Sequence, residues 1–207
     1  MSETPYVVAV CGSRRAGSYT RAGLRYALAG AAGAGAEAEL LDLGDPELEF
    51  PLFHPDRDAE TAGDVADALE RVRRADGVVL GSPVYHGSYS SAFRSFHDWC
   101  SFDEYEDTAV GLLATAGGGS YASTLDHMRS TVRGVHGWVV PHQVGIRNAS
   151  ARFDSPPSDD STVAAETADG PNLPPTGADY LLTDESLRDR TVELGREVTT
   201  AARRLSE

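Results

Sequence analysis

A loop rich in glycine, hydroxyl and arginine residues follows the first apolar run of this 207-residue chain. It reads Gly12-Ser13-Arg14-Arg15-Ala16-Gly17-Ser18-Tyr19-Thr20 and leads into an alanine-rich segment, 16–33, that predicts a helix. A helix N-terminus offers unpaired N–H groups and a partial positive charge, so it favours a phosphate group. The hydroxyls of Ser13, Ser18 and Thr20 can add donors, and an arginine can supply charge. These residues make the loop a candidate phosphate site.

Three other interpretations of this loop are possible, and the sequence disfavours two of them. Gly12 and Gly17 have the spacing of a P-loop, but Ser18 stands where that motif requires lysine, which disfavours nucleotide hydrolysis. The third glycine of a dinucleotide-binding fingerprint is also missing. A hydroxyl-rich helix cap that binds nothing stays open as the structural alternative.

Two further loops carry residue types suited to a flat ligand. The stretch from Gly81 to Trp99 holds aromatic and hydroxyl side chains that could edge a heterocycle, and Gly87 allows close backbone approach. The stretch from Ala114 to Ser120 contains a run of three glycines. Taken alone, such a run is typical of a simple turn.

The elements around these loops predict a doubly wound α/β fold. Continuous apolar runs without alternation are typical of strands buried on both faces, and helical segments separate them. The expected strands lie near 7–10, 40–43, 77–80, 110–114 and 138–140, and the expected helices near 16–33, 61–75, 90–100, 121–135 and 184–205. We therefore expect a doubly wound parallel sheet of five strands with helices on both faces. Among the common strand orders of such sheets, we expect the flavodoxin-like order 2-1-3-4-5. Ligands of such sheets bind beyond the carboxyl ends of the strands, where the order reverses, and all three loops would meet there.

The chain is expected to form a single domain over 1–207. The segment 151–178 contains five prolines and several acidic residues, and it predicts a long surface loop or insertion before the last helix. The two cysteines, Cys11 and Cys100, show no metal-binding or disulfide pattern and are expected to be free thiols.

The composition is strongly acidic. The formal net charge is −14, and all 18 basic residues are arginine. Such a surface repels nucleic acid, and it is typical of proteins from salt-loving organisms. The sequence has no secretory signal pattern and no apolar run long enough for a membrane span, so we expect a cytoplasmic protein without membrane or nucleic-acid partners.

The loops resemble those of the NADPH-dependent FMN reductase family, which overlaps the NAD(P)H:quinone and azo reductases. The family pattern G-S-x-R-x-x-S-x-N/T matches the first loop. A second pattern, P-E-Y-N-G-S-x-P-G-x-L-K-N-x-x-D-W, follows the third strand. The matching residues are Gly12, Ser13, Arg15, Ser18, Thr20, Pro83, Tyr85, Gly87, Ser88, Asp98 and Trp99. The resemblance extends to about Gly145 and includes the last helix, but it does not cover 151–178.

The resemblance implies FMN as the cofactor and NADPH or NADH as the hydride donor. Electrons would pass through the flavin to a quinone, azo compound, free flavin or metal ion, without a catalytic acid or base from the protein. The phosphate ligands would be Ser13, Arg15, Ser18 and Thr20, covered by Tyr19. The ring would rest between two groups of residues: Pro83, Val84, Tyr85, His86, Gly87 and Ser88 on one side, and Thr115, Ala116, Gly117, Gly118 and Gly119 on the other. Family members are usually dimers or tetramers, which implies a homo-oligomer here.

Phe93, Arg94 and Ser95 are similar in kind to the residues of the family pattern, and the chain departs from the pattern at four other positions. Val84 replaces glutamate, His86 replaces asparagine, and Ser90-Ser91 replace Pro-Gly. His86 could donate a proton beside the ring, although a polar loop residue is the simpler interpretation. A non-catalytic flavodoxin-type electron carrier is the alternative function. A receiver domain is disfavoured because Ser82-Pro83 stands where it needs an aspartate.

Overall fold

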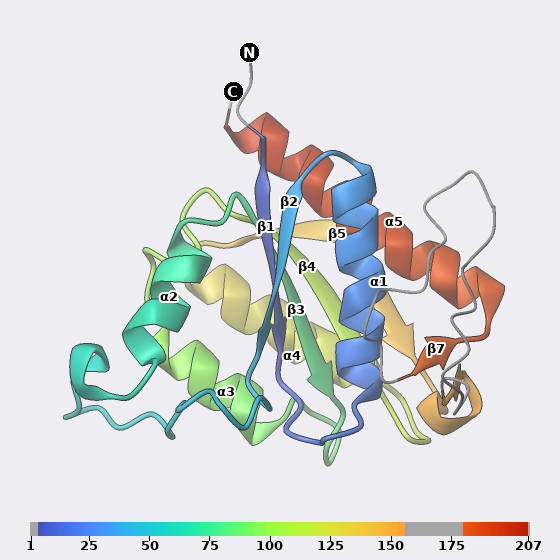
Figure 1. Ribbon diagram of the computed structural model, residues 1–207, viewed down its shortest axis with the longest axis horizontal. Coiled ribbons are helices and arrows are strands. Elements are labelled where there is room, and N and C mark those ends of the chain that lie inside the picture. Colours follow the sequence, from blue (N-terminus) through green and yellow to red (C-terminus); the bar gives the residue numbers. More distant parts are fainter. Residues whose placement is uncertain (1–3, 156–179, 207) are drawn as a thin grey trace.

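The computed structural model describes residues 4–155 and 180–206 and contains the expected parallel sheet (Figure 1). Its order is β2-β1-β3-β4-β5, and all neighbouring pairs run parallel. The strands are β1 Tyr6–Cys11, β2 Glu37–Asp42, β3 Gly77–Pro83, β4 Ala109–Thr115 and β5 Trp138–Ile146. The predicted flavodoxin-like topology is confirmed.

Helices cover both faces of this sheet. One face carries α1 Tyr19–Gly33 and α5 Glu185–Leu205. The other carries α2 Val65–Arg73, α3 Ser91–Trp99 and α4 Ala122–Gly134. Short elements complete the chain: the 3₁₀ turns η1 Ala59–Thr61 and η2 Ala149–Ala151, and the strands β6 Phe153–Asp154 and β7 Leu181–Leu182.

The first strand shows why a continuous apolar run was needed. Val8 and Val10 pack into the core beneath α2, α3 and α4, while Val7, Ala9 and Cys11 pack into the core beneath α1 and α5. All five side chains are fully buried. Because both faces of β1 are covered, neither set of alternating positions tolerates a polar residue.

Side-chain caps begin the helices on which the site depends. The Oγ of Ser18 accepts from the N–H of Arg21 at 3.1 Å, and the Oγ of Ser90 accepts from the N–H of Phe93 at 3.0 Å. Ser90 also donates to the carbonyl of Gly12 at 2.5 Å, which joins the start of α3 to the loop after β1. Ser90, which replaces the family proline, is therefore a helix cap here.

Helices α1 and α5 approach each other through glycine. A Cβ on Gly30 would clash with the carbonyl of Val192, and a Cβ on Gly195 would clash with the carbonyl of Ala27. Only residues without a side chain allow this separation of the two backbones.

The chain between β5 and α5 is only partly described. Residues 156–178 of the expected insertion lie outside the described residues, whereas 151–155 form the end of η2 and the strand β6. Strand β6 pairs antiparallel with β7, with Phe153 opposite Leu182. This hairpin lies beside the N-terminal end of α1 in Figure 1.

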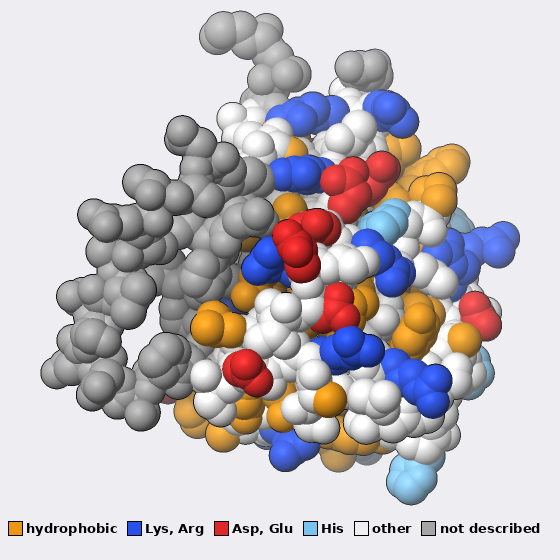
Figure 2. All heavy atoms as spheres, turned by 90° about the vertical axis from the view of Figure 1, so that its right-hand side faces the viewer, with side chains coloured by type: hydrophobic (Ala, Val, Ile, Leu, Met, Phe, Trp, Pro, Cys, Tyr) orange, Lys and Arg blue, Asp and Glu red, His pale blue; other side chains and the backbone are white. Residues whose placement is uncertain are grey.

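Charged side chains are distributed over the surface. Arginine and acidic groups lie interspersed on the face shown in Figure 2. Within residues 4–155 and 180–206, no helix is long and apolar enough to cross a membrane.

Candidate functional site

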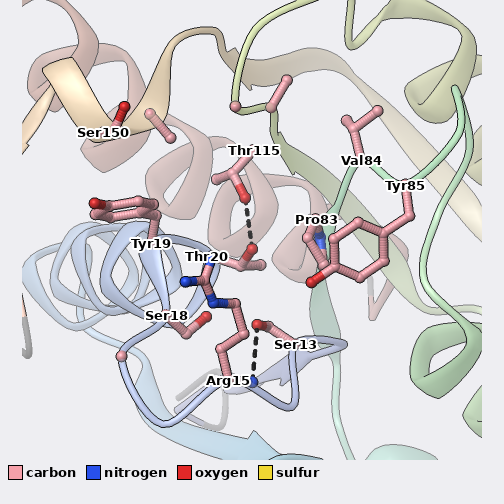
Figure 3. Close-up of a pocket in the computed structure, with 14 residues that line it drawn as sticks. Ser13, Arg15, Ser18, Tyr19, Thr20, Pro83, Val84, Tyr85, Thr115 and Ser150 are labelled. Carbon is pink, nitrogen blue, oxygen red and sulfur yellow. Dashed lines mark hydrogen bonds between the residues drawn. The ribbon is translucent and has the colours of Figure 1, made fainter.

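A pocket of about 390 Å³ opens at the carboxyl ends of the strands (Figure 3). The loop after β1 and the ends of β3 and β4 form most of its wall, and η2 completes it. The lining residues are Ser13, Arg15, Gly17, Ser18, Tyr19, Thr20, Pro83, Val84, Tyr85, Thr115, Ala116, Gly117, Ala149 and Ser150. The three loops that the sequence singled out therefore meet, as expected, at the point where the strand order reverses.

The first loop brings the N-terminus of α1 to the pocket. Ser13 and Ser18 are buried, and Arg15 is exposed and extends toward the middle of the pocket in Figure 3. The first turn of a helix has N–H groups without intrahelical acceptors, so this wall is electropositive. Arg21, one turn into the helix, pairs with Asp42 at 2.7 Å and holds α1 against the end of β2.

Two threonines join the walls at the base of the pocket. The hydroxyls of Thr20, on α1, and Thr115, at the end of β4, are 2.6 Å apart, and both residues are buried. The bond fixes the start of α1 relative to β4. The N–H of Val84 donates to the carbonyl of Thr115 at 2.8 Å, which fixes the loop after β3 as well.

The loop after β3 makes a tight turn beyond Tyr85. Tyr85 and Ser88 pair across a two-residue turn in which His86 and Gly87 have φ of 52° and 78°. Positive φ at both central positions defines a type I′ turn. His86, Gly87 and Ser88 consequently do not line the pocket.

Helix α4 holds this turn in place. The hydroxyl of Ser123 donates to the carbonyl of Gly87 at 2.7 Å, and the hydroxyl of Ser88 lies 3.0 Å from Nδ1 of His127. The sequence did not predict this support, because Ser88 and His127 are far apart in the chain.

The glycine run after β4 is not explained by the protein's own packing. No described atom lies within 4 Å of a Cβ built on Gly117, Gly118 or Gly119, and none of the three has a positive φ. Gly117 lines the pocket, while Gly118 and Gly119 do not. Neither conformation nor steric crowding among the described residues requires glycine here.

The sequence missed three lining residues. Gly17 belongs to the first loop but was not assigned a role, and Ala149 and Ser150 follow the last strand. The N–H of Ala149 donates to the carbonyl of Ala116 at 2.9 Å, which folds this segment onto the β4 loop. Ala149 and Ser150 could have been predicted from their position after the fifth parallel strand.

The cysteine nearest the first loop is not a nucleophile. Cys11 is fully buried, and burial raises the pKa of its thiol to about 12.

Among the described residues, no group of three or more histidine, cysteine, aspartate or glutamate side chains could hold a metal ion. The pocket thus combines an electropositive wall at the N-terminus of α1, the hydroxyl groups of serine and threonine, and exposed backbone at Gly117.

Solved structures share this fold at low sequence identity. FerB, a flavoenzyme NAD(P)H:(acceptor) oxidoreductase from Paracoccus denitrificans, is 19% identical with a TM-score of 0.63, and the match covers 95% of this chain and 98% of that one. A flavodoxin from the domain Archaea is 10% identical with a TM-score of 0.61, covering 98% and 99%. At these identities the likeness shows the fold alone.

Sequence relatives identify the family. An FMN-dependent NADPH-azoreductase of Staphylococcus aureus is 32% identical over 143 residues, which make up 68% of this chain and 76% of that protein. The family model described as NADPH-dependent FMN reductase matches residues 5–151, a span that contains the loops after β1, β3 and β4. The chain therefore belongs to the NADPH-dependent FMN reductase family.

Proposed function

We propose that the chain binds FMN in this pocket and uses it to reduce a small acceptor with electrons from NADPH or NADH. The observation that carries the proposal is the convergence of the family-like loop residues on one pocket at the N-terminus of α1. Bound FMN would supply the chemistry, by accepting a hydride from the nicotinamide and releasing electrons to the acceptor. The residues of the chain would bind, orient and shield the FMN.

The first loop suits the phosphate end of FMN. Ser13, Arg15, Ser18 and Thr20 all line the pocket beside the first turn of α1. Arg15 adds a positive charge to the free N–H groups of the helix, a combination that favours a phosphate dianion. Tyr19 lies at the side of the same loop and would cover it (Figure 3).

The loops after β3 and β4 suit the ring. Pro83, Val84 and Tyr85 form one wall, and Thr115, Ala116 and Gly117 form the adjacent one. A flat ring lying against Gly117 would explain a glycine that the fold itself does not require.

A hydrogen-bond donor to the ring would come from the turn. The N–H groups of Val84 and Tyr85 already donate to Thr115 and Ser88. His86 and Gly87 are the next residues, and their backbone N–H groups are our candidates for contacting the ring edge. We assign His86 no proton-transfer role.

The acceptor is expected to be small. The azo reductase activity in the name of the Staphylococcus aureus relative favours azo compounds, and quinones, free flavins and metal ions are the other candidates. We further propose a homodimer or homotetramer, in which a neighbouring subunit would cover the exposed side of the pocket near Tyr85, whose side chain is half-exposed.

Steady-state turnover tests the proposal. Under anaerobic conditions, protein loaded with FMN in high salt should consume more than one equivalent of NADPH or NADH only when an acceptor is present in excess, tested with an azo dye, a quinone and FMN in turn. Protein prepared without flavin should be inactive with the azo dye and the quinone. Failure to take up FMN would overturn the proposal.

A flavodoxin-type electron carrier is the second candidate. Flavodoxins share this fold and are acidic, as this chain is, and these two features favour it. A carrier would bind FMN in the same pocket but would not be reduced rapidly by a nicotinamide nucleotide.

A further inference from the structure

Tyr180 does not line the pocket, but it packs against the loop of residues 13–20 that we propose to bind the phosphate. A Cβ built on Gly17 would lie 2.6 Å from the hydroxyl oxygen of Tyr180 and 3.2 Å from its ring. The ring centroids of Tyr180 and Tyr19 are 4.6 Å apart. Gly17 and Tyr19 flank Ser18, the cap of α1, so Tyr180 touches the loop on both sides of that cap.

The aromatic contact continues into the β6–β7 hairpin. The ring of Tyr19 stacks on Phe153 of β6 at 5.2 Å with an interplanar angle of 22°. Phe153 is buried and pairs with Leu182 of β7, two residues beyond Tyr180. Tyr19 is therefore held between one aromatic residue from each arm of the hairpin.

The hairpin itself is anchored to the main domain. The N–H of Leu182 donates to the hydroxyl of Tyr26 on α1 at 3.2 Å. Arg152 pairs with Asp184 at 2.6 Å, and Asp184 caps α5 through the N–H of Leu187. Since these contacts reach both α1 and α5, Tyr180 sits on a support that is fixed to the two helices of this face.

We propose that Tyr180 is a positioning residue that holds the loop of residues 13–20 in its phosphate-binding shape. The inference rests on the proposed function and adds a determinant beyond residue 151, where the family match ends. A loop that contains a glycine, here Gly17, has many accessible backbone conformations, and phosphate binding requires one of them. If Tyr180 already holds the loop in the conformation that binds phosphate, the phosphate binds without the entropic cost of ordering the loop.

Flavin affinities with and without a phosphate test the inference. Dissociation constants for FMN and riboflavin are measured by fluorescence quenching for the wild type, Tyr180→Ala and Tyr180→Phe. We expect Tyr180→Ala to weaken FMN binding about tenfold and riboflavin binding less than about twofold, because only FMN uses the loop. Tyr180→Phe keeps the ring against Tyr19 and should lie between the wild type and Tyr180→Ala.

Phe102→Ala serves as the matched control. Phe102 is half-exposed and stacks on His136 at 4.6 Å, in a loop that leads into β4 and lies away from the pocket. The control should leave both affinities unchanged. Equal weakening of FMN and riboflavin by Tyr180→Ala, or no weakening, would overturn the inference.

Hydrogen exchange separates this inference from the proposed function. In protein without flavin, amides of residues 13–20 should exchange faster in Tyr180→Ala than in the wild type, and Phe102→Ala should not change them. A wild type that binds neither flavin would defeat the proposed function, and the exchange rates would then decide the inference. Unchanged exchange in Tyr180→Ala would contradict it.

Discussion

Arg15 and Arg14 are neighbours in the chain but differ in their relation to the pocket. Arg15 lines it and occupies the arginine position of the family pattern, whereas Arg14 is absent from the lining. A charge-assisted hydrogen bond contributes about 1.5–3 kcal/mol, so Arg15→Gln should weaken FMN binding roughly tenfold to a hundredfold. Flavin titration in high salt measures the effect.

Arg14→Gln is the matched control for this prediction. It removes the same formal charge from the same loop, so a general electrostatic effect would appear in both variants. We expect it to change FMN affinity less than about threefold, as for a solvent-exposed charge. Equal losses in the two variants would refute a specific role for Arg15.

We expect His97 to make the stability of the fold depend on pH. Its ring is buried, stacks on Phe93 at 5.9 Å and places Nδ1 3.3 Å from the hydroxyl of Tyr105. Burial lowers the pKa of His97 below its usual 6.5, against the effect of a hydrogen bond that its ring donates to the backbone of Thr131; the nearby Arg94 charge lowers the pKa further, and the Asp98 charge raises it. The unfolded chain therefore binds this proton at a higher pH than the folded chain.

Stability should consequently fall as pH drops below about 6.5 toward the lower folded pKa, and the contribution of His97 is fully present above 6.5. Urea midpoints between pH 7.5 and pH 5.5 measure the decline. His97→Gln cannot take up the proton and should show a shallower decline, whatever its stability at pH 7.5. Parallel declines would show that other groups cause the pH dependence.

Sequence reasoning located residues well where they are fixed by local structure. Ser18 could be placed because a serine before a helix is a cap, and its cap position sets it beside the helix N-terminus. His86 was expected beside the ring; it lies in a type I′ turn and is not among the residues that line the pocket, so its contact with the ring stays a prediction. Ser150 and Tyr180 were missed because their positions depend on how distant segments pack onto the first loop.

At the scale of elements, the contact between α1 and α5 is the most constrained in the fold. Gly195→Ala would drive a methyl group into the carbonyl of Ala27, and overpacking of this kind costs about 1–3 kcal/mol or more. We expect a lower free energy of unfolding, measured by urea denaturation of flavin-free protein.

Gly134→Ala makes the same chemical change at the end of α4, where no described atom lies within 4 Å of the added Cβ. It should be neutral or stabilising by up to about 1 kcal/mol, because alanine has less backbone entropy to lose. A similar loss in both variants would mean that helix propensity, and not the close approach of α1 and α5, governs the effect.

The strands differ in how far their sequences revealed them. Central strands β1 and β4 are buried on both faces, and their apolar runs match their bounds to within one residue at each end, whereas the expected run 77–80 of the equally buried β3 ends three residues before Pro83. The edge strand β5 extends to Ile146, well beyond the expected 138–140, because the exposed Pro141 and the partly buried His142 and Gln143 interrupt its apolar run and its register shifts opposite Val110 and Leu112. Strands β6 and β7 have two residues each, too short for any periodicity.

At the scale of the whole molecule, net charge should govern stability in solution. The formal charge of −14 implies self-repulsion, and screening shortens the Debye length from about 30 Å at 0.01 M salt to about 3 Å at 1 M. The melting temperature should therefore rise by several degrees between these NaCl concentrations. A melting temperature that stays constant or falls would contradict the salt-adapted interpretation of the composition.

The most direct test of the proposed reductase activity is anaerobic mixing of the FMN-loaded protein with NADPH, followed through the flavin absorption band. We expect the protein to take up FMN and the band to bleach within seconds, before any acceptor is added. A band that persists with both NADPH and NADH would contradict the reductase assignment and favour an electron carrier. A protein that takes up no FMN would contradict the assignment of the pocket itself.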